Sequence, residues 1–229
     1  MEKLTAKVMR IRRETSDIVT IYFVVLNHDF RYVAGQYVTV FFDDSSTPEG
    51  KAYSLPSAPH EKWQSITVKK VGEYSGRLHK FRAGDTFQIS EAYGTFNPQT
   101  DKPLVCISAG CGLSPIWSVL KDEFRANNSR QAHVFFSNKT VNSIPFVDLL
   151  SRRSAENPAL SVRHYITRQN EVPPHMKTER INLDACVDAV KDEAVYLVCG
   201  SANFVRDMWR GLTERGVPTQ LISTETFFE

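Results

Sequence analysis

The first hundred residues carry short apolar runs, alternating or rich in β-branched residues, and turn residues separate them. Residues 27–29, 43–50, 72–73 and 84–85 hold the Gly, Asn and Asp typical of turns. This pattern predicts short antiparallel strands that close into a Greek-key β-barrel. The expected strands are 6–11, 18–25, 37–42, 65–69 and 86–90.

After residue 100 the pattern changes, because apolar strands alternate with segments of helical spacing. This succession predicts an α/β fold with a five-stranded parallel sheet and helices on both faces. The polar, proline-bounded segment 97–103 predicts a linker, hence two domains at 1–99 and 100–229. The expected strands are 104–108, 133–136, 160–166, 194–199 and 220–223, and the expected helices are 115–126, 145–153, 182–191 and 203–214.

Composition narrows the class of protein. The 229 residues are 41% apolar and carry 28 basic against 26 acidic side chains, with both signs interspersed. That balance gives no support for nucleic-acid or membrane-surface binding. The start of the chain lacks a secretory signal, and the longest apolar run, 18–26, is too short to span a bilayer. We therefore expect a cytoplasmic protein with no membrane span.

Four cysteines stand at positions 106, 111, 186 and 199. They form no Cys-x-x-Cys pair, and no histidine stands at zinc-ligand spacing from them. Without a secretion signal, free thiols in a reducing compartment are expected. The sequence thus predicts no metal site and no disulfide.

A glycine turn, Gly110 to Pro115, lies between the apolar run 104–108 and a helical segment. Its glycines allow a tight turn and close approach to a ligand, and Pro115 suits a first helical turn. Free amides at a helix start favour a pyrophosphate, although a tight turn without ligand explains the same residues. A second turn, Cys199-Gly200-Ser201, ends the fourth strand, so both turns should face one crevice.

Six short motifs occur in a fixed order and together resemble the ferredoxin–NADP reductase superfamily. Its pattern is Arg-x-Tyr-Ser, Gly-x-x-Ser-x-x-Leu and Gly-x-Phe in the barrel, then Gly-x-Gly-x-Thr-Pro, Cys-Gly-Pro and a terminal Glu-x-aromatic. The finer resemblance is to the NADH oxidoreductases that serve hybrid-cluster proteins. The matching segments are Lys51-Ala52-Tyr53-Ser54, Gly72 to Leu78, Gly94-Thr95-Phe96, Gly110 to Pro115, Cys199-Gly200-Ser201 and Glu225-Thr226-Phe227.

The resemblance implies an FAD-dependent NAD(P)H oxidoreductase, with FAD on the barrel and NADH or NADPH on the α/β domain. Tyr53 would stack on the flavin, Ser54 would lie beside its N5 atom, and Phe227 would cover the ring face that nicotinamide must occupy. Ser54, Cys199 and Glu225 are the implied catalytic residues. The implied cofactor-binding residues are Lys51, Ala52, Tyr53, Ser54, Thr67, Val68, Lys69, Tyr74, Ser75, Gly76, Arg77, Gly110, Gly112, Ser114, Pro115, Arg168, Cys199, Gly200 and Phe227.

The chain departs from the family pattern at two positions. Lys51 replaces an arginine and loses its bidentate fork for phosphate, and Ser201 replaces a proline. No iron–sulfur domain follows Glu229, so we expect electrons to pass singly to an iron–sulfur or similar centre on a separate protein. Thr167-Arg168 resembles the Ser-Arg of NADPH users, whereas the finer resemblance favours NADH.

The same residues also fit two further classes of protein. A non-catalytic electron-transfer or regulatory subunit would keep the same fold, and a flavin-free dehydrogenase would leave the barrel without a task. Cys199 is also typical of a small buried residue, and Phe227-Phe228 of a core anchor. The cations at 69–70, 77, 80 and 82 suit a docking patch for an acidic protein or a solvated face.

Overall fold

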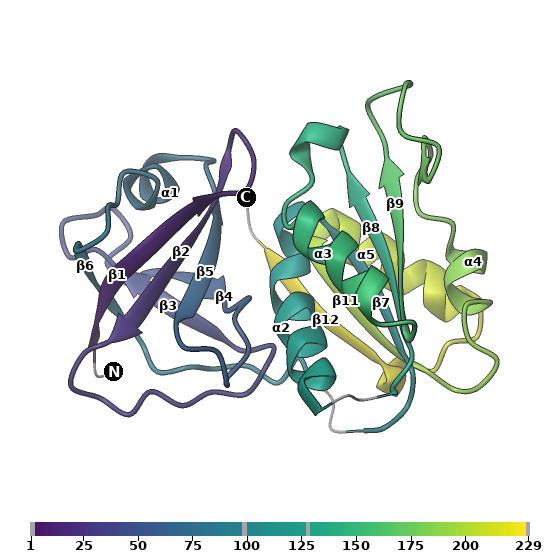
Figure 1. Cartoon of the computed structure of the whole chain (residues 1–229), viewed down its shortest axis with the longest axis horizontal. Helices are drawn as coiled ribbons and strands as arrows, with labels where there is room; N and C mark the ends of the chain where they lie inside the picture. The colour runs from purple at the N-terminus through teal and green to yellow at the C-terminus, as the bar shows by residue number, and fades with distance from the viewer. Residues whose placement is uncertain (1–2, 98–99, 127–128, 228–229) are drawn as a thin grey trace.

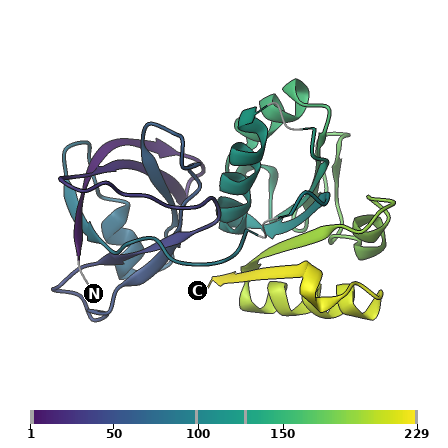
Figure 2. The same ribbon diagram turned by 90° about the horizontal axis from the view of Figure 1, so that it is seen from below.

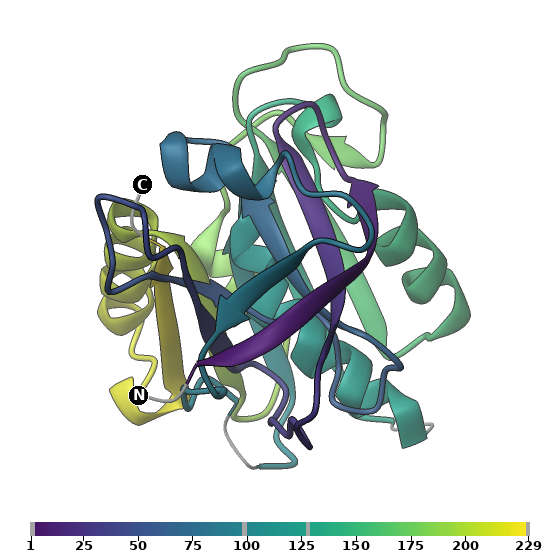
Figure 3. The same ribbon diagram turned by 90° about the vertical axis from the view of Figure 1, so that its left-hand side faces the viewer.

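The computed structural model describes residues 3–97, 100–126 and 129–227. It contains two lobes, one built on an antiparallel sheet and the other on a parallel sheet with helices on both faces (Figure 1). The barrel lobe and the α/β lobe, as they are called below, lie side by side along the long axis of the molecule. Figure 3 looks onto the barrel lobe, with the α/β lobe behind it.

The barrel lobe contains six strands in the order β4-β3-β6-β1-β2-β5. Alternation explains its core, since β1 buries Leu4, Ala6 and Val8 and turns the residues between them outward. A short helix, α1 (Glu73–Leu78), packs Leu78 against that core. The strands are β1 (Leu4–Arg13), β2 (Ile18–Val25), β3 (Tyr37–Phe41), β4 (Lys51–Ser54), β5 (Gln64–Lys69) and β6 (Thr86–Ile89).

The α/β lobe is a parallel sheet in the order β10-β9-β8-β7-β11-β12. Helices α2 (Leu113–Glu123) and α3 (Val147–Glu156) cover one face, and α4 (Leu183–Val187) and α5 (Ala202–Glu214) cover the other (Figure 2). The strand order reverses between β7 and β11, which makes their carboxyl ends the switch point where such sheets bind ligands. The strands are β7 (Leu104–Ala109), β8 (Ala132–Asn138), β9 (Leu160–Ile166), β10 (Met176–Lys177), β11 (Val195–Ser201) and β12 (Ile222–Phe227).

The two-domain fold class is confirmed, with one correction. The parallel sheet has six strands instead of the expected five, because Met176–Lys177 pairs with β9 as a two-residue strand. Two residues are too few to show a periodicity in the sequence. The predicted helix 182–191 is also shorter, because α4 ends at Val187. The expected linker, 97–103, lies partly outside the described residues, so the boundary at 99/100 stays a prediction.

Candidate functional site

The two glycine turns pack directly on each other at the switch point. A Cβ atom on Gly112 would lie 2.3 Å from the Cys199 carbonyl oxygen and 2.9 Å from the Gly200 nitrogen. Gly110 has φ +53°, in the left-handed region that favours glycine. The predicted turns therefore meet at one crevice, and position 112 has no space for any side chain.

A polar contact joins the two lobes at this crevice. The Ser54 hydroxyl, at the end of β4, donates a hydrogen bond to the Glu225 carboxyl group on β12. Glu225 lies opposite Cys199 in the register between β12 and β11. The three residues that the resemblance marks as catalytic are thus adjacent, although 171 positions separate Ser54 from Glu225.

Burial sets the protonation of these groups. It raises the pKa of Glu225 to about 7, against the lowering effect of the Ser54 hydroxyl. The pKa of the Cys199 thiol is raised well above its ordinary value by burial first and by the Glu225 charge second. Near neutral pH, Glu225 can therefore take up and release a proton, whereas Cys199 stays a neutral thiol.

Cations and aromatic rings gather on the barrel side of the crevice. Lys51 Nζ lies 5.6 Å from the centre of the Tyr74 ring. The Arg77 guanidinium lies 4.2 Å from the centre of the Phe42 ring. Tyr53 is half-buried against the barrel core, and burial raises the pKa of its phenol. Arg77 is also ion-paired with Asp44 at 2.7 Å. The surface therefore offers rings for stacking beside the Lys51 charge and a partly neutralised Arg77, a combination that suits an aromatic pyrophosphate compound.

The segment 73–78 differs from expectation in one detail. The composition of Gly72 to Leu78 predicts a short helix whose open end carries the amides of Ser75, Gly76 and Arg77. The helix begins earlier, at Glu73, and the Gly76 amide already donates to the Gly72 carbonyl at 2.8 Å. Gly76 is consequently no free amide donor, although a Cβ there would meet only Lys70 Cε, at 4.0 Å. The surface at Gly76 is therefore open.

The three FAD-binding candidates of β5 have different surroundings. The Thr67 hydroxyl is hydrogen-bonded to that of Thr20 at 2.9 Å, and the Val68 side chain is buried in the barrel core. Only the main chain of Val68 can meet a ligand. β5 contacts Gly110–Gly112 of the glycine turn, which places Lys69 at the end of β5 near the crevice.

Buried polar atoms without partners mark the α/β side of the crevice. Ser114 is 2% exposed, and its hydroxyl has no hydrogen-bond partner among the described residues. The Ser108 hydroxyl and the Asn138 side-chain nitrogen, near the carboxyl ends of β7 and β8, are also buried and have no hydrogen-bond partner among the described residues. Such groups fit a polar ligand that supplies the missing bonds. Ser108 is not among the site residues that the sequence predicts. The one feature of the sequence that could have indicated it is its place near the end of an apolar strand.

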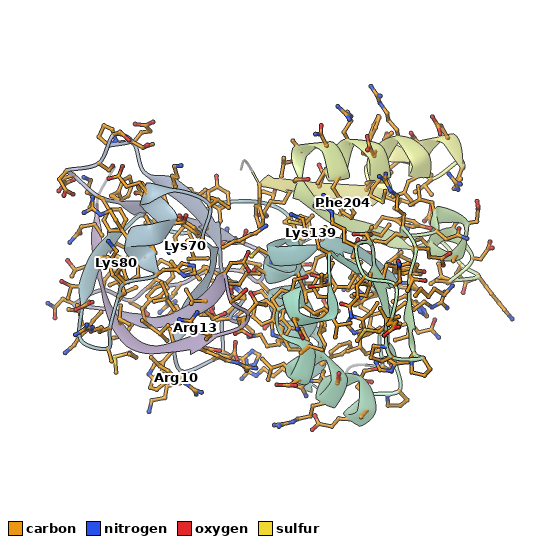
Figure 4. The ribbon with its side chains drawn as sticks, turned by 90° about the horizontal axis from the view of Figure 1, so that it is seen from above. Arg10, Arg13, Lys70, Lys80, Lys139 and Phe204 are labelled. Carbon is orange, nitrogen blue, oxygen red and sulfur yellow. The ribbon has the colours of Figure 1, made fainter. Side chains whose placement is uncertain are left out.

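Thr167-Arg168, which resembles the Ser-Arg of NADPH users, lies at the end of β9 beside Asn138 and Lys139 at the end of β8; all four are sequence candidates for a 2′-phosphate site. The Arg168 amide donates to the Lys139 carbonyl at 2.8 Å, and the Thr167 amide donates to the Asn138 carbonyl at 3.0 Å. Figure 4 shows Lys139 near the middle of the face that carries these strand ends. Phe227 is half-buried opposite Ser201 in the sheet, while Phe228 lies outside the described residues.

The described residues contain no group of three or more His, Cys, Asp or Glu side chains placed to hold a metal ion. The four cysteines are free thiols. Across the same ranges, no helix combines the length and apolarity needed to cross a bilayer.

Comparison with known proteins agrees with this architecture. Residues 106–209 match the model of the oxidoreductase NAD-binding domain. The chain is 30% identical to the flavohemoprotein of Bacillus subtilis over 86% of its length, and 25% identical to the reductase component 1 of terephthalate 1,2-dioxygenase from Comamonas over 86%. It spans 51% and 60% of the length of these two relatives.

Among solved structures, a ferredoxin NADP⁺ reductase from Neisseria gonorrhoeae with bound FAD and NADP has the same fold. The TM-score is 0.83 at 20% identity, with both chains fully covered. The chain thus has the two-lobe fold of this reductase. In sequence and fold, the chain is thus similar to members of the ferredoxin–NADP reductase superfamily.

Proposed function

We propose that this protein is an FAD-dependent NAD(P)H oxidoreductase that takes hydride from NAD(P)H and passes electrons singly to a separate redox protein. The observation that carries the proposal is the Ser54–Glu225 contact beside Cys199. It brings one group from the barrel lobe and two from the α/β lobe to one point. A reaction between two cofactors, one on each lobe, requires such a meeting point.

FAD would occupy the barrel side of the crevice. Tyr53 would stack on its ring, while Lys51 and Arg77 would neutralise its pyrophosphate. Residues 1–99 would be the FAD-binding domain and 100–229 the NAD(P)-binding domain. When bound, FAD supplies the capacity to accept a hydride and to release electrons one at a time.

The chain's own groups would position and shield the reaction. The Ser54 hydroxyl would hold the reacting edge of the ring in place, and Glu225, with its pKa of about 7, would hold a proton next to it. Cys199 would contribute a small, uncharged surface below the nicotinamide. Phe227 would exclude water from the ring until nicotinamide displaces it.

The nicotinamide nucleotide would lie on the two glycine turns. Gly110, where a Cβ would meet nothing within 4 Å, gives an open backbone surface, and the Ser114 hydroxyl, without a partner among the described residues, offers a hydrogen bond. The finer resemblance leads us to propose NADH as the donor, although Lys139 and Arg168 would also suit the 2′-phosphate of NADPH. The proposal of a separate electron acceptor is supported by the relative named as a dioxygenase reductase component.

Anaerobic stopped-flow mixing of the FAD-loaded protein with NADH, and separately with NADPH, tests the proposed function. We expect the flavin absorption band to bleach with at least one donor, and faster with NADH. A protein that binds no FAD, or whose FAD neither donor reduces, would be a regulatory subunit instead. Tyr53→Ala should lower the FAD content after purification, and Tyr93→Ala, a substitution of an exposed tyrosine, is the matched control.

A further inference from the structure

A second cavity lies between the lobes, away from the glycine turns. It measures about 460 Å³, a volume within the range of small-molecule sites. Its walls come from β1, β2 and β5 on one side and from α2, α3 and the segment before α3 on the other. None of the residues proposed to hold FAD or nicotinamide lines it.

The arginine cavity, as we call it, is strongly basic. Five cationic side chains and two carboxylates line it: Arg10, Arg12, Lys121, Arg152, Arg153, Glu61 and Glu156. Figure 4 shows Arg10 on the opposite side of the molecule from Phe204, the ring that packs on the Cys199-Gly200 turn.

Two of the five cations are already neutralised. Lys121 forms an ion pair with Glu61, which holds α2 against the barrel lobe. Arg12 lies 3.5 Å from Glu14 and 3.9 Å from Asp148. The Glu14 carboxylate also accepts the Phe146 amide at 3.3 Å. These interactions hold the side chains that line the cavity in place on both lobes.

The remaining cations are available to a ligand. Among the described residues, no carboxylate lies within ion-pair distance of Arg10 or Arg152, and Arg153 has only a 3.8 Å contact with Glu156. Arg10 extends over the Tyr22 ring, with 5.9 Å between guanidinium and ring centre. Guanidinium groups on two facing walls match an anion with several charged oxygens, because each can give two parallel hydrogen bonds.

We propose that the arginine cavity binds a small molecule bearing a phosphate or pyrophosphate group. Phosphate places two or more charges within the reach of Arg10 on the barrel lobe and Arg152 and Arg153 on α3. A bound anion of this kind would link the two lobes on the side away from the crevice. The proposal stands whether or not the crevice performs the proposed redox reaction.

Calorimetric titration of the FAD-loaded full chain with sodium pyrophosphate, at constant ionic strength and with saturating NAD⁺, tests this site. We expect wild-type binding, and at least tenfold weaker binding in the double variant Arg10→Ala, Arg152→Ala. Both side chains are exposed, and circular dichroism checks that the variant is folded. The matched control removes two exposed arginines of α5, Arg206→Ala and Arg210→Ala, and should bind within twofold of wild type.

Three outcomes would overturn the proposal. Wild-type protein that releases no heat of binding has no such site. If the cavity variant and the control bind pyrophosphate with equal affinity, any weakening relative to wild type comes from the change in net charge alone. In repeat titrations without NAD⁺ and at rising NAD⁺ concentrations, pyrophosphate binding that weakens as NAD⁺ increases would place the anion on the glycine turns instead.

Discussion

Two of the contact regions between the lobes, one at β12 and one at α2, differ in kind. At β12 the contact is one hydrogen bond, between Ser54 and Glu225, near an unpartnered Ser114 hydroxyl among the described residues. At α2, which lies next to the barrel lobe in Figure 2, the groups are paired: Ser118 donates to the Ser57 carbonyl at 2.6 Å, and Lys121 pairs with Glu61. The α2 contacts hold the lobes together, whereas the β12 side keeps polar groups that a ligand can satisfy.

The largest effect is expected from Gly112→Ala, which adds a methyl group where the two glycine turns pack on each other on the β12 side. The new methyl group would meet the Cys199 carbonyl at 2.3 Å, and main chain cannot give way cheaply. We expect a loss of about 3 kcal/mol in the free energy of unfolding, measured by urea denaturation. Gly72→Ala is the control, since nothing lies within 4 Å of a Cβ there. Equal stability of the two variants would contradict the packing described for the turns.

Ser54→Ala and Ser118→Ala should differ in their effect on the rate of flavin reduction, because Ser54 lies in the β12 contact and Ser118 in the α2 contact. Removing the hydroxyl that faces Glu225 should slow flavin reduction about 100- to 1,000-fold, because a positioned donor at the reacting atoms contributes about that much. Ser118→Ala removes a hydroxyl from the α2 set and should leave this rate unchanged. Stopped-flow absorbance measures both variants. If the two variants slow flavin reduction equally, the Ser54 hydroxyl has no role in the reaction beyond its contribution to the contact between the lobes.

The pKa of Glu225 predicts a pH dependence of stability. In the unfolded chain a glutamate releases its proton near pH ~4.3, whereas the folded value is about 7. Between these values only the folded state keeps the proton, so stability should fall as pH rises to about 7 and then level off. The carboxyl is partly exposed, which reduces the expected difference to about 1–2 kcal/mol. Denaturation of wild type and Glu225→Gln at several pH values measures it; parallel curves would refute the raised pKa.

The smallest effect concerns the α2 side alone. Ser118→Ala leaves the buried Ser57 carbonyl without this donor, and we expect a loss of about 1 kcal/mol in unfolding free energy. Thr213→Ala, at a partly exposed position whose hydroxyl bonds to its own helix, should cost less. A larger loss in the control would show that the α2 contact adds nothing to stability.

Site residues can be predicted from the sequence where the backbone conformation or its packing allows only one residue type. Gly110 and Gly112 are predictable because a left-handed turn and a 2.3 Å approach exclude other residues. The Ser54–Glu225 pairing is not, since it depends on how the lobes dock. The same holds for the arginine cavity, whose cations come from strands and helices far apart in the chain. Ser108 and β10 carry too short a pattern for prediction.

A crystal structure of the protein with FAD tests the central claim most directly. The account predicts the flavin ring against Tyr53, with its N5 atom within hydrogen-bond distance of the Ser54 hydroxyl and Glu225 on the same side. Phe227 should cover the opposite face of the ring. Flavin bound elsewhere, with Ser54 and Glu225 out of reach of the ring, would contradict it.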